Sequence, residues 1–122
     1  METYTLVRPE HLNHYGKLFG GELLKWIDET AWLAAARDFP GSSFVTVAMD
    51  EITFKQQVEN GAILRFDINA VRQGNSSVQY EVHVFGDFPG ASEEVEVFST
   101  KVTFVNVDKN GKAVRLEKRL NI

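Results

Sequence analysis

A single long helix-forming segment, in a chain that otherwise alternates like sheet, is the feature that most constrains the fold. Residues 21–38 are rich in Leu, Ala, Lys and Glu, which favour helices, and Pro40 and Gly41 follow where such a helix should end. Six other stretches have the composition or alternation of strands: 3–7, 44–55, 63–72, 78–85, 94–107 and, as an expected edge strand, 113–117. Because one helix cannot cover both faces of such a sheet, we predict an α+β fold in which a curled antiparallel sheet of five to six strands wraps around one central helix.

Length and composition narrow the class of protein. The 122 residues suffice for one core, so residues 1–122 are expected to form a single domain. The longest apolar run, residues 31–36, is far shorter than the roughly 20 residues that span a bilayer, and no basic-then-apolar leader is visible. We therefore expect a cytoplasmic protein without a membrane partner. The net charge of −4 argues against general nucleic-acid binding.

The chain offers few residues for metal or covalent chemistry. It contains no cysteine, which excludes disulfides, thiolate metal sites and cysteine nucleophiles. Its three histidines, His11, His14 and His83, form no His-Glu-x-x-His pattern, and no Gly-x-Ser-x-Gly is present. We expect neither a metal nor another cofactor.

Asp28 interrupts the apolar side of the predicted helix. At 100° per residue it falls on the side that should face the sheet, where a lone carboxylate is costly to bury unless it is paired or functional. One interpretation places Asp28 at the edge of that side, where it reaches water or Lys25. The other makes it a general base, or a carboxylate that activates a nucleophile, in a partly dry site. The residues that share its side of the helix are Gly21, Leu24, Ala31 and Ala35.

Gly20 and Gly21 mark the predicted start of the helix. The free N–H groups of a helix start attract negative charge, and residues without side chains let a ligand approach that backbone closely. The pair could therefore polarise a carbonyl oxygen as an oxyanion hole. Equally, the glycines could serve only tight packing where the loop meets the helix. The residues alone leave both interpretations open.

The segment around these residues resembles the signature of hotdog-fold acyl-CoA thioesterases. The family pattern is an Asn, a Gly three positions on, a Gly-Gly pair, and then a helix that bears Asp or Asp-Glu. Asn13, Gly16, Gly20-Gly21 and Asp28-Glu29 match this pattern in order. The resemblance extends over nearly the whole chain through four further stretches: residues 45–54, 61–64, 74–77 and 103–108.

This resemblance implies an activity and a set of residues. The family fold, a long helix wrapped by an antiparallel sheet, agrees with the fold predicted above, and the implied activity is hydrolysis of an acyl-CoA to a carboxylic acid and CoA. Asn13 and Asp28 match the family's catalytic pair, and Gly20 and Gly21 match the helix start whose amides face the thioester carbonyl. Asp28 would act as a general base on water, or attack the thioester directly, while Asn13 would hold the water or the thioester.

A non-hydrolytic hotdog protein is the alternative. It could be a regulatory module that binds acyl-CoA, or a dehydratase-like lyase that uses His14 with Asp28. Release of free thiol from assorted acyl-CoAs favours the hydrolase, whereas stable binding without turnover favours the module.

The sequence also predicts where CoA binds, but it does not specify the acyl group. An acidic protein needs a local cationic patch for the CoA phosphates, and Arg72 stands beside Gly74, Ser76 and Ser77, a turn whose amides and hydroxyls can also bind phosphate. The competing interpretation is an ordinary polar hairpin. Six aromatic residues could either line an acyl tunnel or fill the core: Tyr15, Phe19, Trp26, Trp32, Phe39 and Phe54.

The expected site is shared between subunits. Seven residues separate Gly21 from Asp28, about 10 Å along a helix axis, which is too far for one helix to supply both the oxyanion hole and the base. Two chains paired about a two-fold axis with antiparallel helices would close this gap, with Asp28 of one facing Gly21 and Asn13 of the other. The family's usual dimer is arranged in this way. A homodimer is therefore expected as the minimal unit and a tetramer or hexamer as the assembly.

Overall fold

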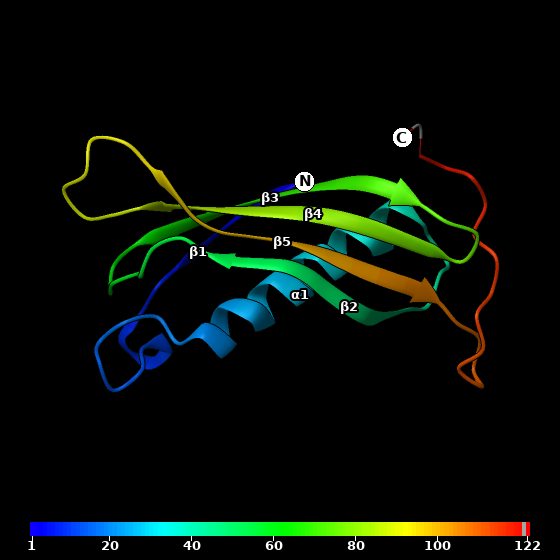
Figure 1. Cartoon of the computed structure of the whole chain (residues 1–122), viewed down its shortest axis with the longest axis horizontal. Helices are drawn as coiled ribbons and strands as arrows, with labels where there is room; N and C mark the ends of the chain where they lie inside the picture. Colours follow the sequence, from blue (N-terminus) through cyan, green and yellow to red (C-terminus); the bar gives the residue numbers. More distant parts are fainter. Residues whose placement is uncertain (121) are drawn as a thin grey trace.

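In the part of the chain that the structure describes, residues 1–120 and 122, five antiparallel strands form one sheet that curls around one α-helix, α1 (Gly20–Asp38) (Figure 1). The structure is a computed structural model. The strands are β1 (Glu2–Leu6), β2 (Phe44–Phe54), β3 (Ile63–Gln73), β4 (Ser77–Asp87) and β5 (Val95–Asn106). They lie in the order β1-β3-β4-β5-β2, and each neighbouring pair is antiparallel. A 3₁₀ turn, η1 (Pro9–His11), precedes the helix.

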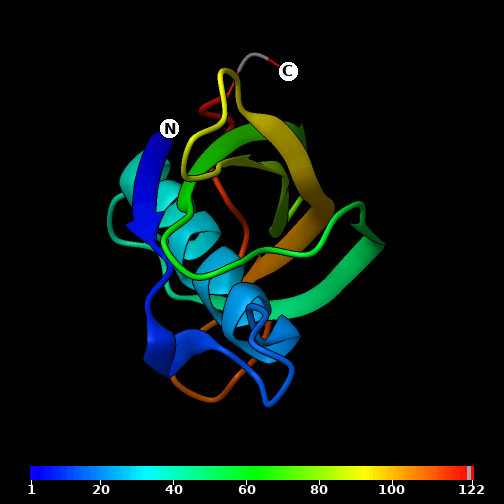
Figure 2. The same ribbon diagram turned by 90° about the vertical axis from the view of Figure 1, so that its left-hand side faces the viewer.

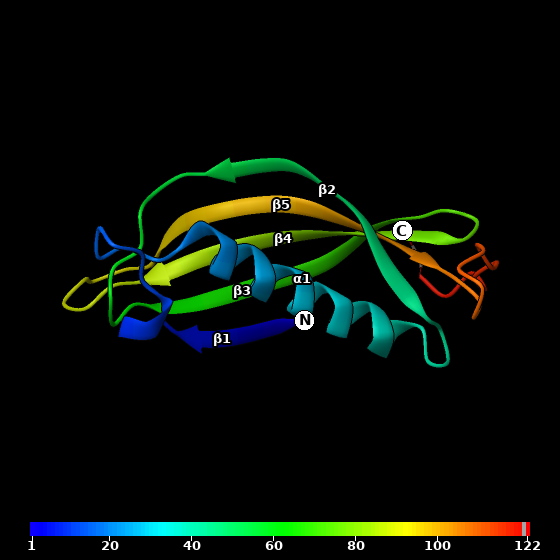
Figure 3. The ribbon, with the colours of Figure 1, turned by 90° about the horizontal axis from the view of Figure 1, so that it is seen from below.

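The helix lies in the hollow of the sheet. Figure 2 shows the strands curving around α1, and Figure 3 shows the helix crossing the strands on one face of the sheet. β4 presents alternate residues to this helix, as its period of two predicts, and its buried residues are Val78, Tyr80, Val82, Val84 and Gly86. The prediction of a central helix wrapped by an antiparallel sheet is confirmed.

The buried side of α1 is rotated from the predicted one. Gly21 is exposed and Asp28 is half-buried, so both lie at the margin of the core rather than on the side that faces the sheet. Trp26 takes a core position instead, and its ring meets the His11 ring edge-on with centroids 4.7 Å apart. A large indole buries more apolar area than a glycine or a small side chain, and this favours the rotation. The helix residues in the core are Leu23, Trp26, Ile27, Ala31, Ala34 and Ala35.

β2 forms one edge of the sheet and is irregular. Its pairing with β5 shifts register twice, at residues 46–48 and 50–53. Within the second shift Glu51 adopts a φ of 54°, a left-handed conformation that costs about 1–2 kcal/mol for a residue other than glycine. The buried Thr100 hydroxyl donates to the Asp50 carbonyl (2.7 Å), which supplies a partner for the backbone at this bulge.

The predicted edge strand at residues 113–117 is wrong. This segment forms one isolated bridge, between Val107 and Ala113, and no ladder. Its amides bond instead to the end of β5 and to the turn between β3 and β4: Val114 N–H donates to the Asn106 carbonyl (2.8 Å), and Leu116 N–H donates to the Asn75 carbonyl (2.8 Å). The Leu116 side chain is buried in the core. Apolar packing of this side chain, rather than pairing with a strand, therefore holds the segment in place. No helix among the described residues is long and apolar enough to cross a membrane.

Candidate functional site

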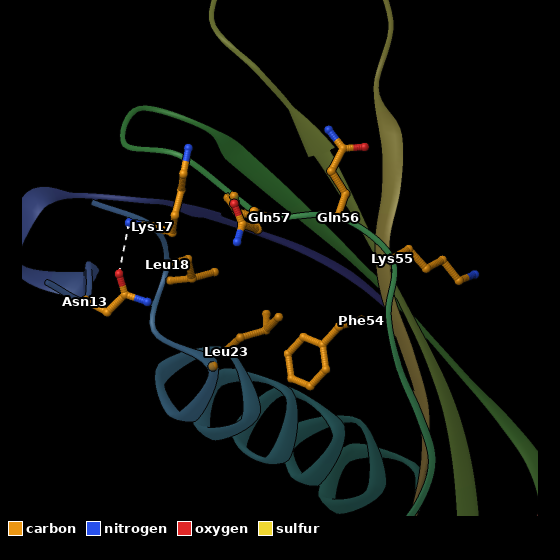
Figure 4. Close-up of a pocket in the computed structure, with 10 residues that line it drawn as sticks. Asn13, Lys17, Leu18, Leu23, Phe54, Lys55, Gln56 and Gln57 are labelled. Atoms are coloured by element: carbon orange, nitrogen blue, oxygen red, sulfur yellow. Dashed lines mark hydrogen bonds between the residues drawn. The ribbon is translucent and has the colours of Figure 1, made fainter. Parts of the chain in front are cut away.

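The loop before α1 fixes the orientation of Asn13. The Asn13 Oδ1 atom accepts hydrogen bonds from the backbone N–H groups of Tyr15 (2.9 Å) and Lys17 (3.2 Å), and the Asn13 N–H donates to the Lys17 carbonyl (2.7 Å). Gly16 closes this turn with a φ of 76°, which glycine adopts without strain. Because backbone N–H groups can only donate, Oδ1 must face the loop, and the side-chain NH₂ points toward the pocket (Figure 4).

A second segment, the chain after β2, holds this loop in place. Leu18 N–H donates to the Val58 carbonyl (2.7 Å), and Lys17 Nζ lies 2.8 Å from Glu59 Oε1. The hydrogen bond and charge of Lys17 hold the pKa of Glu59 below its usual range. Backbone and side-chain contacts therefore both join the Asn13 loop to residues 58 and 59.

A pocket of about 480 Å³ opens between these two segments and the start of α1 (Figure 4). Asn13 and Gly20 both line it, so the structure brings together two of the residues predicted from the sequence. Its apolar wall is formed by Leu18, Leu23, Phe54 and Val58, and its other side chains are those of Lys17, Lys55, Gln56 and Gln57. The pocket thus combines amide groups with an apolar wall.

The helix start at this pocket is uncapped by side chains. Phe19, the residue before α1, has an extended backbone and makes no capping hydrogen bond. Among the described residues, no hydrogen bond uses the N–H of Gly20 or Gly21. A Cβ on Gly20 would lie 3.7 Å from the Phe54 ring, an ordinary contact, whereas a Cβ on Gly21 would lie 2.7 Å from the Phe19 ring. A side chain at residue 21 would therefore require the exposed Phe19 ring to move, and the described contacts leave the N–H groups of Gly20 and Gly21 without a partner.

Asp28 is held by a residue that the sequence reasoning missed. The Thr46 hydroxyl of β2 donates to Asp28 Oδ1 at 2.6 Å. Lys25, the other partner considered for Asp28, pairs with Glu22 (3.4 Å). Asp28 lies at the edge of the apolar side of the helix, as one of the two interpretations of the sequence predicted. Its partner, however, is a neutral hydroxyl rather than water or Lys25. The sequence offered one signal for Thr46: it lies within residues 45–54, one of the stretches that resemble the thioesterase family.

One chain does not bring Asp28 to the pocket. Eight residues separate it from Gly20, about 12 Å along the helix axis, and it is not among the residues that line the pocket. It lines a smaller hollow of about 280 Å³ with Glu29, Trp32 and Leu33. Asn13 and Gly20 therefore meet within the chain, and Asp28 stands apart.

The predicted CoA-binding residues lie together at the other end of the helix. Arg72, Gly74, Ser76 and Ser77 belong to the hairpin between β3 and β4, and the Arg72 side chain is exposed. The C-terminal tail packs against this hairpin: Gln73 Nε2 donates to the Glu117 carbonyl (2.7 Å). The same tail reaches the last residue of α1, since Arg119 Nε donates to the Asp38 carbonyl (3.1 Å). The hairpin is thus far from Gly20, and one chain does not join the two predicted subsites (Figure 1).

The histidines do not contribute to the pocket. His11 Nδ1 accepts from the Arg8 N–H (3.0 Å), and His14 is exposed and lies against the Tyr15 ring. Neither lines the pocket. Across residues 1–120 and 122, no group of three or more His, Asp and Glu side chains is placed to hold a metal ion.

His83 instead forms a charged cluster on the outer face of the sheet. Its Nδ1 atom lies 2.5 Å from Glu96 Oε1, and its Nε2 atom bonds to Glu81. Lys55, which lines the pocket, pairs with the same Glu96 (2.7 Å). The bonds to Glu96 and Glu81 raise the pKa of His83, and the bonds from His83 and Lys55 lower the pKa of Glu96.

Comparison with known proteins identifies similar chains. A sequence profile of the thioesterase superfamily matches residues 15–88. An uncharacterized acyl-CoA thioester hydrolase of Zymomonas mobilis is 33% identical over 105 residues, which are 86% of this chain and 70% of that protein. Mouse acyl-coenzyme A thioesterase 11 is 37% identical over 100 residues, which are 82% of this chain and 17% of that protein. The chain thus spans about a sixth of the length of this mouse relative.

Solved structures resemble the whole fold. A hexameric hotdog-fold thioesterase of Campylobacter jejuni superposes with a TM-score of 0.84 at 32% identity, covering 95% of this chain and 89% of that one. An acyl-CoA hydrolase of Staphylococcus aureus, in complex with butyryl-CoA and CoA, superposes with a TM-score of 0.85 at 28% identity, covering 95% of this chain and 70% of that one.

The Staphylococcus aureus hydrolase has also been studied with single residues replaced by alanine. The replaced residues are an asparagine, an aspartate and a threonine. By their numbers, the asparagine precedes the aspartate by fifteen positions, and the threonine follows the aspartate by seventeen.

Proposed function

The chain belongs to the thioesterase superfamily, and we propose from this that it hydrolyses an acyl-CoA to a carboxylic acid and CoA. One observation carries the proposal. The Asn13 NH₂ group points into the pocket, and Gly20, whose N–H makes no hydrogen bond among the described residues, lines the same pocket. Donors that are fixed before the substrate arrives stabilise the negative charge that develops on a thioester carbonyl oxygen under attack.

Asp28 and Thr46 supply the attacking part of this proposal. Asp28 removes a proton from water as a general base, or adds to the carbonyl itself, and Thr46 holds the carboxylate in place through one oxygen. The spacing of the residues studied in the Staphylococcus aureus hydrolase supports these assignments. Asn13 and Asp28 are fifteen positions apart, as in that protein, and Thr46 follows Asp28 by eighteen rather than seventeen.

A site shared by two chains is part of the same proposal. Asp28 stands about 12 Å from the helix start of its own chain, so it reaches a carbonyl held there only if a second copy supplies the other half. Four large apolar side chains of the edge strand β2 are open for such pairing: Val45, Val47, Ile52 and Phe54. The hexameric state of similar thioesterases favours a homodimer that assembles further, into a tetramer or hexamer.

The hairpin with Arg72, Gly74, Ser76 and Ser77 is the proposed binding site for the CoA phosphates. It lies far from the helix start of its own chain, so the phosphates of a CoA bound at one pocket would meet the hairpin of another subunit. An exposed guanidinium next to a turn that carries two serine hydroxyls suits a phosphate. A cytoplasmic location completes the proposal, because CoA thioesters are made and used inside cells.

Thiol release from purified protein tests this function. Incubation with acetyl-, butyryl- and hexanoyl-CoA should release free CoA at a steady rate, and Asp28→Asn should abolish most of that release. Binding of the same acyl-CoAs in calorimetry without thiol release would instead identify a binding module. His14 lies outside the pocket of its own chain, as Asp28 does, so thiol release is the measurement that separates the hydrolase from the lyase alternative.

A further inference from the structure

A small apolar surface on α1 adjoins Asp28. The hollow of about 280 Å³ is lined by Asp28, Glu29, Trp32 and Leu33. Trp32 is 40% exposed and Leu33 is 49% exposed, although both are large and apolar. Residues four apart lie on one face of a helix, so Trp32 follows Asp28 directly and Leu33 follows Glu29. We call the exposed surfaces of these two side chains the Trp32–Leu33 shelf.

The shelf is rigid on its Trp32 side. The Trp32 Nε1–H donates to the Phe44 carbonyl at the start of β2 (3.1 Å). This bond fixes the indole while leaving part of its ring open to solvent. Tryptophan has only two side-chain torsions, so a ring anchored in this way offers apolar area with little further loss of entropy on binding.

The six aromatic residues left unassigned by the sequence now separate into two groups. Trp26 and Phe39 are buried in the core, whereas the other four are exposed: Tyr15, Phe19, Trp32 and Phe54. Phe19 and Phe54 flank the helix start. Trp32 alone of these four lines the hollow that contains Asp28.

We infer that the Trp32–Leu33 shelf holds the acyl chain, and that the preferred substrates carry uncharged hydrocarbon acyl groups; this inference rests on the proposed function. The two sides of the thioester differ in chemistry. The pantetheine arm contains amides, and the pocket at the helix start offers the carboxamides of Gln56 and Gln57 to them. A hydrocarbon chain needs only apolar contact, which Trp32 and Leu33 supply, whereas an amide buried there would lose its hydrogen bonds.

Charge narrows the substrate class further. The four residues that line the hollow include two carboxylates, Asp28 and Glu29, and no cation. An acyl group that ends in a carboxylate would meet like charges and no partner on this surface. A succinyl group should therefore be rejected in favour of a butyryl group, which has the same number of carbons.

The position of the shelf predicts a dependence on chain length. Trp32 lies four residues beyond Asp28, about 6 Å along the helix axis. An acetyl group is too short to cover the shelf, and each further methylene that packs on it should raise kcat/KM by up to about fourfold. The increase should stop once the shelf is covered.

Specificity profiles of matched variants test the inference. The kcat/KM of the wild type, Leu33→Asn, Trp32→Ala and Val71→Ala is measured with acetyl-, butyryl-, hexanoyl- and succinyl-CoA, and the assembly state of each is checked by sedimentation. Leu33 makes no side-chain hydrogen bond that could be lost, so its variant keeps the test valid if Trp32→Ala folds poorly. Val71 is also exposed but lies at the end of β3, away from the hollow.

We expect the wild type to prefer hexanoyl- over acetyl-CoA and butyryl- over succinyl-CoA by about tenfold or more. Leu33→Asn and Trp32→Ala should lose roughly fivefold or more with hexanoyl-CoA and progressively less with shorter chains, while Val71→Ala follows the wild type. Equal losses at every chain length in correctly assembled variants, an unchanged profile, or efficient hydrolysis of succinyl-CoA would overturn the inference alone. A wild type that hydrolyses none of the four would overturn the proposed function, and the inference with it.

Discussion

The Thr46 hydroxyl lies 2.6 Å from Asp28 Oδ1 and donates to it, so the edge strand β2 fixes a carboxylate on the central helix. Thr46 itself is exposed, and its hydroxyl serves no other contact in the described residues. One oxygen of Asp28 is thereby occupied, and the other is left for water or substrate. In the proposed mechanism, this contact gives Thr46 the role of a positioning residue, which can be measured.

Removing the Thr46 hydroxyl should slow catalysis. Thr46→Val keeps the shape of the side chain but loses a hydrogen bond to a carboxylate, worth about 1.5–3 kcal/mol, so kcat should fall roughly tenfold or more. Thr46→Ser keeps the hydroxyl and should retain most of the activity. Steady-state kinetics give the kcat of both variants, and equal kcat values for Thr46→Val and Thr46→Ser would refute the positioning role.

Asp28→Asn tests the attacking group itself. The amide keeps the size of the side chain but can neither take a proton from water nor attack a thioester, so kcat should fall by roughly 10² or more. Because Asp28 lies at the margin of the core, the melting temperature should change little. A purified Asp28→Asn protein with wild-type turnover would remove Asp28 from the mechanism.

Subunit mixing tests the shared site. Asn13→Ala and Asp28→Asn are each expected to be inactive, but a mixed dimer contains one intact site and one doubly damaged site. Activity should therefore return when the two proteins exchange subunits. Exchange is followed independently with differently tagged chains, and exchange without recovery would mean that each chain carries a complete site.

Arg72→Ala tests the phosphate contact. Loss of one charge-assisted hydrogen bond should raise KM for an acyl-CoA roughly tenfold, with kcat nearly unchanged. A short thioester without the nucleotide has no phosphate to lose and serves as the control substrate. Similar increases in KM for both substrates would exclude a phosphate contact at Arg72.

The His83 cluster predicts a pH-dependent stability. The pKa of His83 is raised by Glu96 and Glu81, so its contribution is fully present below the ordinary histidine pKa of about 6.5 and is lost as the pH rises through the raised value. His83→Gln should therefore destabilise the protein most near pH 6 and progressively less as the pH is raised toward alkaline values. Urea unfolding of both proteins across this range measures the difference, and a constant difference would indicate packing rather than charge.

The sequence predicted the helix and strands well where glycine, proline or turn residues mark their ends. The helix was expected at residues 21–38 and occurs at Gly20–Asp38, because Gly20 and Gly21 mark its start and Pro40 follows it. Strands bounded by turns, such as β3, were placed within a residue of their ends. The expected strand at residues 113–117 failed because alternation alone does not reveal that Leu116 has a pocket to fill and no free strand beside it.

The candidate site was predicted only in part. The sequence identified Asn13 and Gly20, which meet at one pocket because they belong to one continuous loop and helix start. Thr46 was not found, since its contact with Asp28 depends on how the edge strand passes the helix. The rotation of α1 was also missed, because a periodicity argument weights every apolar residue equally and so does not give Trp26 its large share of the buried area.

The two edge strands of the sheet affect the tendency of the protein to aggregate as well as its fold. β2 is long and exposes apolar side chains such as Val47 and Phe54, the features that favour endless stacking of identical strands into fibres. Its two register shifts and the left-handed Glu51 break the row of backbone groups that a growing fibre would copy. The opposite edge, β1, has only five residues. Substituting Glu51 with a residue that straightens β2 would relieve local strain and, by the same change, open a path to aggregation.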